Sequence, residues 1–216
     1  MSIATASLLA RALDDSVPDA GDQMGERILD AALHLVAVAG LRHLTMDDVA
    51  ARAGVGRMTV YRRFSTRQEL VDALALREAR RCLLQIAAAV DLTAPLHDRL
   101  ADVFARTIRV IREHPLLARL AHVEPEALLR ELTRNDSEVF GLVRRFLIEQ
   151  VREAQSAGEL AATDPEALAE LALRLAVSFV LIPDSVLAVE DEARTRERVR
   201  ALVAPLLRAD LAPAAD

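Results

Sequence analysis

Apolar residues recur three and four positions apart along this chain, and this helical period is the feature that most constrains its fold. Ile28, Ala31, Ala32, Leu35 and Ala39, for example, fall on one side of a helix. No segment shows the alternation of apolar and polar residues that half-buried strands require. The helix formers Ala, Leu, Arg and Glu are abundant, whereas aromatic residues make up only 3% of the 216 residues. The sequence therefore predicts an all-α protein.

Glycine and proline mark the ends of the predicted helices. Gly40 follows the first periodic segment as a C-terminal cap, and Pro125 and Pro165 each fit the first turn of a helix. Before the first helix, residues 1–24 show no sustained period and are expected to form a flexible leader. The predicted helices cover residues 27–39, 46–53, 57–64, 67–90, 96–113, 116–132, 137–156, 165–182 and 190–210, with a kink or break at Pro205.

Residues 45–64 hold two short helices around a glycine turn, Gly54-Val55-Gly56, with the small Ala50 where two helices must approach closely. This arrangement is typical of a helix-turn-helix, whose second helix enters the major groove of DNA. Arginine forks to guanine or phosphate, threonine offers a hydroxyl and a methyl group, and tyrosine donates to phosphate. The polar positions of the second helix are Arg57, Thr59, Tyr61, Arg62 and Arg63.

Five patches of this region resemble, in order and spacing, the N-terminal domain of the TetR repressor family. They are Ile28 with Ala31-Ala32 and Gly40, Thr45-Met46-Asp47-Asp48-Val49-Ala50, Ala53-Gly54-Val55, Thr59-Val60-Tyr61-Arg62-Arg63-Phe64 and Gln68-Glu69-Leu70. The resemblance covers about residues 27–71; the rest of the chain resembles the family only in being helical and of suitable length. It implies a homodimer of nine or ten helices, in which a small effector molecule releases operator DNA.

The sequence departs from the usual family pattern at four places. Gly56 and Met58 replace a Ser and a frequent Gly, Arg63 stands where His is common, and Arg67 stands where Lys often contacts phosphate. Met58 can touch a thymine methyl group, so the base preference is expected to differ from that of relatives. The predicted DNA-binding residues are Thr45, Arg57, Met58, Thr59, Tyr61, Arg62, Arg63 and Arg67.

The predicted organisation is a three-helix DNA-binding domain at residues 25–71, whose last helix continues to about residue 90, and a ligand-binding and dimerisation domain at residues 92–210. Residues 167–182 carry only Glu170 and Arg174 as charges, so this helix is expected to be buried on two sides, one of them against a partner subunit. Helix 190–210 would complete a four-helix bundle. Two recognition helices would then enter major grooves about 34–36 Å apart on a palindromic operator.

An effector pocket is expected among the helices at 96–113, 116–132, 137–156 and 165–182. Few charges point there, which favours an apolar or amphipathic effector with one or two hydrogen-bonding groups. An ordinary core stripe would show the same pattern. The candidate lining residues are Phe104, Thr107, Ile108, His122, Phe140, Phe146, Ser178 and Phe179.

Other chemistries find little support in the sequence. The Gly54-x-Gly56 pair lacks the third glycine and preceding strand of a nucleotide-binding loop, and no nucleophile motif is present. The five histidines show no metal-ligand spacing, and the single Cys82 lacks a resolving partner. We therefore expect no enzyme activity, cofactor, metal or membrane span, and a cytoplasmic location. A helical small-molecule-binding or adaptor protein that does not bind DNA remains the alternative.

The net charge of −6 hides a basic segment within an acidic chain. All 27 basic residues are Arg. Residues 25–81 carry ten Arg against seven acids, a net charge of +3, whereas residues 1–24 sum to −3 and residues 82–216 to −6. This polarity favours DNA at the predicted helix-turn-helix and disfavours it elsewhere.

Overall fold

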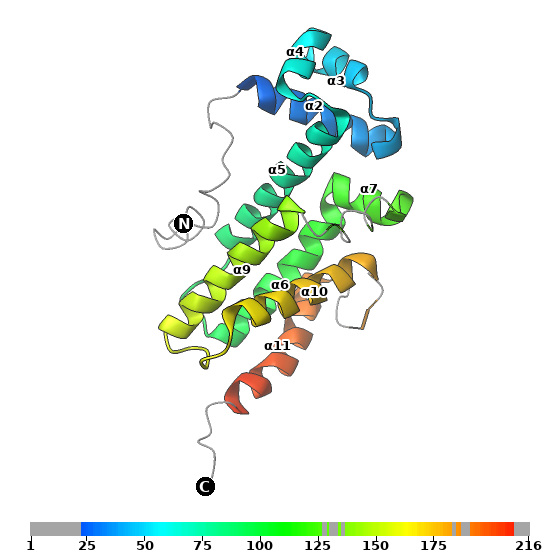
Figure 1. Ribbon diagram of the computed structural model, residues 1–216. Helices are drawn as coiled ribbons and strands as arrows, with labels where there is room; N and C mark the ends of the chain where they lie inside the picture. Colours follow the sequence, from blue (N-terminus) through cyan, green and yellow to red (C-terminus); the bar gives the residue numbers. More distant parts are fainter. Residues whose placement is uncertain are drawn as a thin grey trace. The chain divides into compact units, whose positions relative to one another are not determined.

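The computed structural model describes residues 23–126, 129, 134, 137–182, 185–186 and 191–209 (Figure 1). These residues contain helices and no strand, which confirms the predicted all-α class. The predicted leader, apart from Gln23 and Met24, lies outside the described residues. The elements are α2 (Gln23–Ala39), the short 3-10 helix η2 (Leu41–His43), α3 (Met46–Ala53), α4 (Arg57–Arg63), α5 (Arg67–Ala88), α6 (Leu96–Glu113), α7 (Pro115–Val123), α9 (Glu138–Ser156), α10 (Pro165–Leu181) and α11 (Glu192–Ala209).

The sequence predicts the ends of two helices wrongly: α2 begins before residue 27, and α7 ends at Val123 and not at residue 132. Helix α2 begins at Gln23, four residues before Arg27, and its Gly25 is buried. A glycine carries no apolar side chain, so the periodicity gave no sign of this first turn. Helix α11 continues to Ala209 with Pro205 inside it, so the proline does not end the helix.

The chain forms two compact units. Of the described residues, the first unit combines 23–81 with those between 113 and 142, and the second combines 82–112 with those between 143 and 209. Helix α7, which falls inside the predicted 92–210 domain, thus groups with the helices of the predicted DNA-binding domain. The functional boundaries at 25–71 and 92–210 stay predictions, because compactness does not report function.

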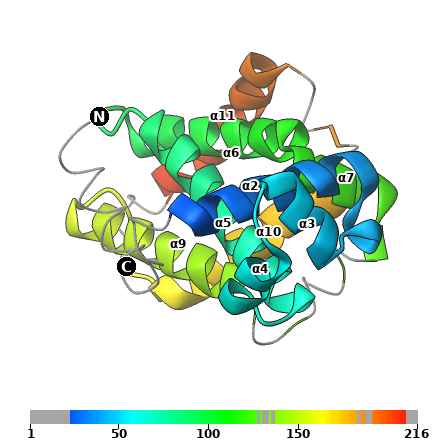
Figure 2. The same cartoon turned by 90° about the horizontal axis from the view of Figure 1, so that it is seen from above.

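Helices α2, α3 and α4 lie side by side in the first unit (Figure 2). The core between these helices consists of buried apolar side chains, and burying each large one stabilises the fold by about 1.5–3 kcal/mol. Helix α7 adds Leu116 to the same cluster. The side chains with at most 1% exposure are Ile28, Ala32 and Val36 of α2, Val49 of α3, Val60 of α4, and Leu70 and Leu74 of α5.

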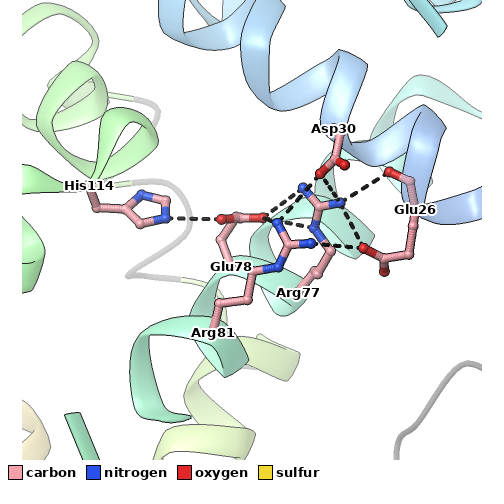
Figure 3. A network of polar contacts seen from close by, with 6 residues as sticks. All are labelled: Glu26, Asp30, Arg77, Glu78, Arg81 and His114. Carbon is pink, nitrogen blue, oxygen red and sulfur yellow. Dashed lines mark hydrogen bonds and ion pairs between the residues drawn. The ribbon is translucent and has the colours of Figure 1, made fainter. Parts of the chain in front are cut away.

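An ionic network that is buried at Arg77 and Glu78 ties α5 to α2 in this unit (Figure 3). The guanidinium of Arg77, whose side chain is only 9% exposed, donates from Nη1 to Asp30 Oδ1 at 2.9 Å and from Nε to Glu78 Oε1 at 2.8 Å. One turn further along α5, Arg81 donates from Nη2 to Glu26 Oε2 at 2.9 Å. Two arginines of α5 therefore hold two carboxylates of α2.

The same network reaches the start of α7 through Glu78, which is 5% exposed. His114 is the N-cap residue of α7, and its Nε2 lies 3.0 Å from Glu78 Oε2. Burial acts to raise the pKa of Glu78, but the hydrogen bond with His114 and the charges of Arg77 and Arg81 outweigh it and hold this pKa below its ordinary value. Glu78 thus stays ionised in the native protein.

In the second unit, ion pairs join α6 to α11. Asp98 pairs with Arg200 at 2.7 Å, and Arg109 pairs with Glu192 at 3.0 Å. Between them Asp102 pairs with Arg196. The residue numbers rise on α6 as they fall on α11, so the two helices run antiparallel. No helix in the described part of the chain is long and apolar enough to cross a membrane.

Replacing Glu78 by Gln is expected to lower the free energy of unfolding by about 3 kcal/mol at pH 7, because the buried Arg77 loses its buried carboxylate partner and keeps only the exposed Asp30 and Glu26. The native pKa of Glu78 is lowered, so the stabilisation is fully present above the ordinary pKa and is lost as the pH falls below that value and through the lowered native pKa. The difference from the unsubstituted protein should therefore shrink below about pH 4. Urea denaturation at several pH values measures this difference in the free energy of unfolding.

Glu153→Gln is the matched control, since Glu153 is an exposed residue of α9. The urea concentration at its unfolding midpoint should equal that of the unsubstituted protein within error. A Glu78→Gln midpoint equal to that of the control would contradict a stabilising role for the network.

Candidate nucleic-acid interface

Helix α4 is oriented by the residues it buries. Val60 is fully buried and Phe64, which follows the helix, is 7% exposed, as the spacing predicts. Met58 and Arg62 lie on the side opposite Val60, and Arg57 lies at its edge; all three residues are exposed, Met58 to 77%. Met58 is thus a large apolar side chain exposed to solvent beside two arginines.

Arg57, the first residue of α4, is held by two neighbours. Its Nε lies 2.9 Å from Asp47 Oδ1 of α3, and its guanidinium carbon lies 5.3 Å from the centre of the Tyr61 ring, one turn along α4. Hydrogen bonding with Tyr61 and the charge of Asp47 raise the pKa of Arg57 above its ordinary value. Arg57 is thus a permanent cation with a preferred position.

The turn between α3 and α4 depends on a left-handed glycine. Gly54 has φ of 64° and ψ of 40°, a region that side chains with a Cβ disfavour, and Val55 N donates to Ala50 O at 3.0 Å. From α2, Arg27 Nη2 donates to Ala53 O at 2.8 Å and so caps the end of α3. Nothing in the sequence marks Arg27 for this role, because its acceptor is a backbone carbonyl 26 residues away.

Arg67 lies at the start of α5 and binds the loop before α3. Its Nε donates to Leu44 O at 2.8 Å, and its Nη2 donates to Leu41 O. The phosphate contact that the sequence predicts for Arg67 stays a prediction, and the structure adds a second task, which is to hold the α2–α3 loop. Two donors of one guanidinium meet two carbonyls here.

The other predicted DNA-binding residues lie on or beside the same two helices. Thr45 is the exposed N-cap of α3; its hydroxyl accepts from Asp48 N at 3.1 Å and donates to Asp48 Oδ2 at 2.6 Å. Thr59 and Tyr61 are half-buried, and Arg63 is exposed. Their roles toward DNA stay predictions.

The predicted effector residues are brought together only in part. In the second unit Phe104 and Phe179 meet edge to face with ring centres 4.9 Å apart, and Ile108 and Phe146 are buried. Thr107 donates its hydroxyl to Val103 O of its own helix, and Ser178 is exposed. Phe140 belongs to the first unit, and the side chain of His122 lies outside the described residues. The pocket stays a prediction.

Two helices joined by a glycine turn, with the second presenting arginines to solvent, define a helix-turn-helix protein. Residues 28–74 match the family model of bacterial regulatory proteins of the tetR family. This match confirms the resemblance found in the sequence: residues 28–74 are a helix-turn-helix domain of the TetR type, and relatives over most of the chain are HTH-type transcriptional regulators.

Relatives support this assignment over most of the chain. An uncharacterized HTH-type transcriptional regulator of Mycobacterium tuberculosis is 28% identical over 183 residues, 84% of this chain and 84% of the relative. The HTH-type transcriptional regulator AlkX of M. tuberculosis is 26% identical and covers 73% of this chain and 75% of its own length.

Solved structures share the fold. The TetR-family repressor AlkX of Dietzia sp., implicated in biodegradation of n-alkanes, aligns with a TM-score of 0.62 and 24% identity over 86% of this chain and 95% of that one. The repressor QsdR of R. erythropolis aligns with a TM-score of 0.60 and 25% identity over 87% of this chain and 96% of that one.

Replacing Arg67 by Lys tests which task this residue performs. A lysine keeps the positive charge but lacks the two separate, rigidly spaced nitrogens with which Arg67 binds Leu44 O and Leu41 O, so it cannot reproduce this geometry. We expect a loss of about 1 kcal/mol in the free energy of unfolding, measured by urea denaturation. Arg62→Lys, at an exposed position of α4, is the control and should change nothing. If the two variants are equally stable, the hydrogen bonds of Arg67 to the loop do not contribute to stability, and only its positive charge matters.

Proposed function

We propose that this regulator is a ligand-responsive DNA-binding protein, a repressor that a small apolar or amphipathic effector releases from a palindromic operator. The observation that carries the proposal is the exposed face of α4, where Arg57, Met58 and Arg62 are presented by a helix anchored through Val60. Arginine reads guanine by a forked contact, and methionine can contact a thymine methyl group. These roles would give sequence-selective binding in the major groove of DNA, in the cytoplasm.

The protein is proposed to bind as a homodimer through α10 and α11. Leu171 and Leu175 of α10 are 56% and 54% exposed, and Ile182, the C-cap residue of this helix, is 65% exposed. On α11, Leu202 is 54% exposed. Large exposed aliphatic side chains at helical spacing indicate a surface that a partner covers. TetR-family regulators dimerise, so a second copy of this chain is the expected partner.

The proposed effector is apolar because the candidate lining residues are. Phe104, Ile108, Phe146 and Phe179 offer aromatic and aliphatic surface, and Phe104 meets Phe179 edge to face. The similarity to AlkX of Dietzia sp., which is implicated in biodegradation of n-alkanes, supports an effector with a hydrocarbon part. Its binding would favour a dimer whose recognition helices no longer match the groove spacing, with the change passing along α5.

Selection from random duplexes, followed by titration of the selected duplex against a random one, tests DNA binding. The unsubstituted protein should prefer the selected duplex by about a thousandfold or more at physiological salt. Arg57→Ala should relax the base preference, because the residue assigned to base readout is lost. Arg144→Ala, at an exposed arginine of α9, is the control and should keep the preference. Failure of every duplex to exceed background would refute the proposal.

Leu175→Glu tests the dimer. A carboxylate in the centre of the exposed α10 stripe should separate the subunits, because its burial against the partner's leucines would be unfavourable. Light scattering should then report 23.6 kDa instead of twice that mass. Val38→Glu, at a 65% exposed position of α2, is the control and should leave the dimer intact. A stable monomer without any substitution would favour the adaptor alternative instead.

A further inference from the structure

Asp47 of α3 stands beside the arginine assigned to base readout. Its side chain is 57% exposed, and its Oδ1 lies 2.9 Å from Nε of Arg57, which is 62% exposed. An ion pair this exposed adds little to folding stability, because water screens both charges. The main effect of the Asp47–Arg57 ion pair is therefore on the contacts that Arg57 makes with DNA.

The carboxylate changes which acceptors Arg57 favours. A free guanidinium binds phosphates anywhere along DNA, since every phosphate carries a negative charge. With Asp47 at its Nε, Arg57 already has an anionic partner, and a phosphate would have to compete with that carboxylate. The oxygen and nitrogen acceptors of a guanine edge are neutral, so they can accept from the remaining donors without displacing Asp47.

Asp47 also limits the freedom of Arg57. The carboxylate is on one side and the Tyr61 ring, 5.3 Å from the guanidinium carbon, is the second contact. A side chain held in place before binding loses less conformational entropy when it meets its target. The benefit is greatest for a contact that needs one geometry, as a forked contact to guanine does.

We infer that Asp47 is a specificity-determining residue of this regulator: it pairs with Arg57 and so directs that arginine to a base edge in place of the phosphate backbone. The inference rests on the proposed DNA-binding function. Asp47 is an acidic residue in a segment whose net charge is positive. Its contact with Arg57 joins α3 to α4. Asp47 acts through Arg57 and is a positioning residue.

Asp47→Asn tests this inference with two duplexes, the selected one and a random one. Affinity for the random duplex should rise, and its salt dependence should steepen by about one unit of slope, because Arg57 is freed for a phosphate. Affinity for the selected duplex should rise less, so that the ratio of the two affinities falls about tenfold. Thermal unfolding should show that the variant remains folded.

Asp48→Asn is the matched control. Asp48 is the next residue of α3 and also carries a carboxylate, but its Oδ2 accepts from the Thr45 hydroxyl and not from Arg57. Both variants remove one negative charge at the same helix end. Only Asp47→Asn should lower the affinity ratio, and a fall of the same size in both variants would overturn the inference.

The double variant Asp47→Asn with Arg57→Ala completes the cycle. If Asp47 acts through Arg57, Asp47→Asn should have no effect on the ratio once Arg57 is absent. An undiminished effect would overturn the inference. If the unsubstituted protein discriminates between the duplexes but Asp47→Asn keeps the ratio within twofold, the inference alone fails. If the unsubstituted protein binds neither duplex, the proposed function itself fails.

Discussion

The burial of Val60 is the constraint on which the arrangement of the interface depends. Val60 is in the middle of the seven-residue helix α4, and its side chain belongs to the same core cluster as Ile28, Val49 and Leu70. A helix this short has little stability of its own, so its position comes from that packing. With Val60 turned inward, Arg57, Met58 and Arg62 face solvent.

Arginine performs two different tasks in the first unit. Arg27 and Arg67 donate to backbone carbonyls at the ends of the loops that flank α3, whereas Arg77 is buried and pairs with carboxylates. Arg57 and Arg62 remain on the exposed face of α4. The net charge of +3 over residues 25–81 therefore overstates the charge offered to a partner, because part of it is used internally.

Much of the fold was predictable because its signals are local. The helical period around Ile28, the cap at Thr45 and the glycine turn that begins at Gly54 depend on residues within a few positions of one another, and all three occur as expected. The predicted start of α2 was wrong, since Gly25 is buried without contributing to the period. The effector pocket was harder to predict from the sequence, because an apolar stripe on a helix predicts burial and does not distinguish a packed core from a ligand cavity.

The sequence by itself determined the all-α class, the helix-turn-helix and the residue types on the recognition helix, because each depends on short-range spacing and backbone chemistry. Only the tertiary structure decided which arginines hold loops and which face solvent, since the partners of Arg67 lie 23 and 26 residues away. It also brought Asp47 to Arg57 and His114 to Glu78. Such contacts form between separate helices once the core orients them, and no local pattern encodes them.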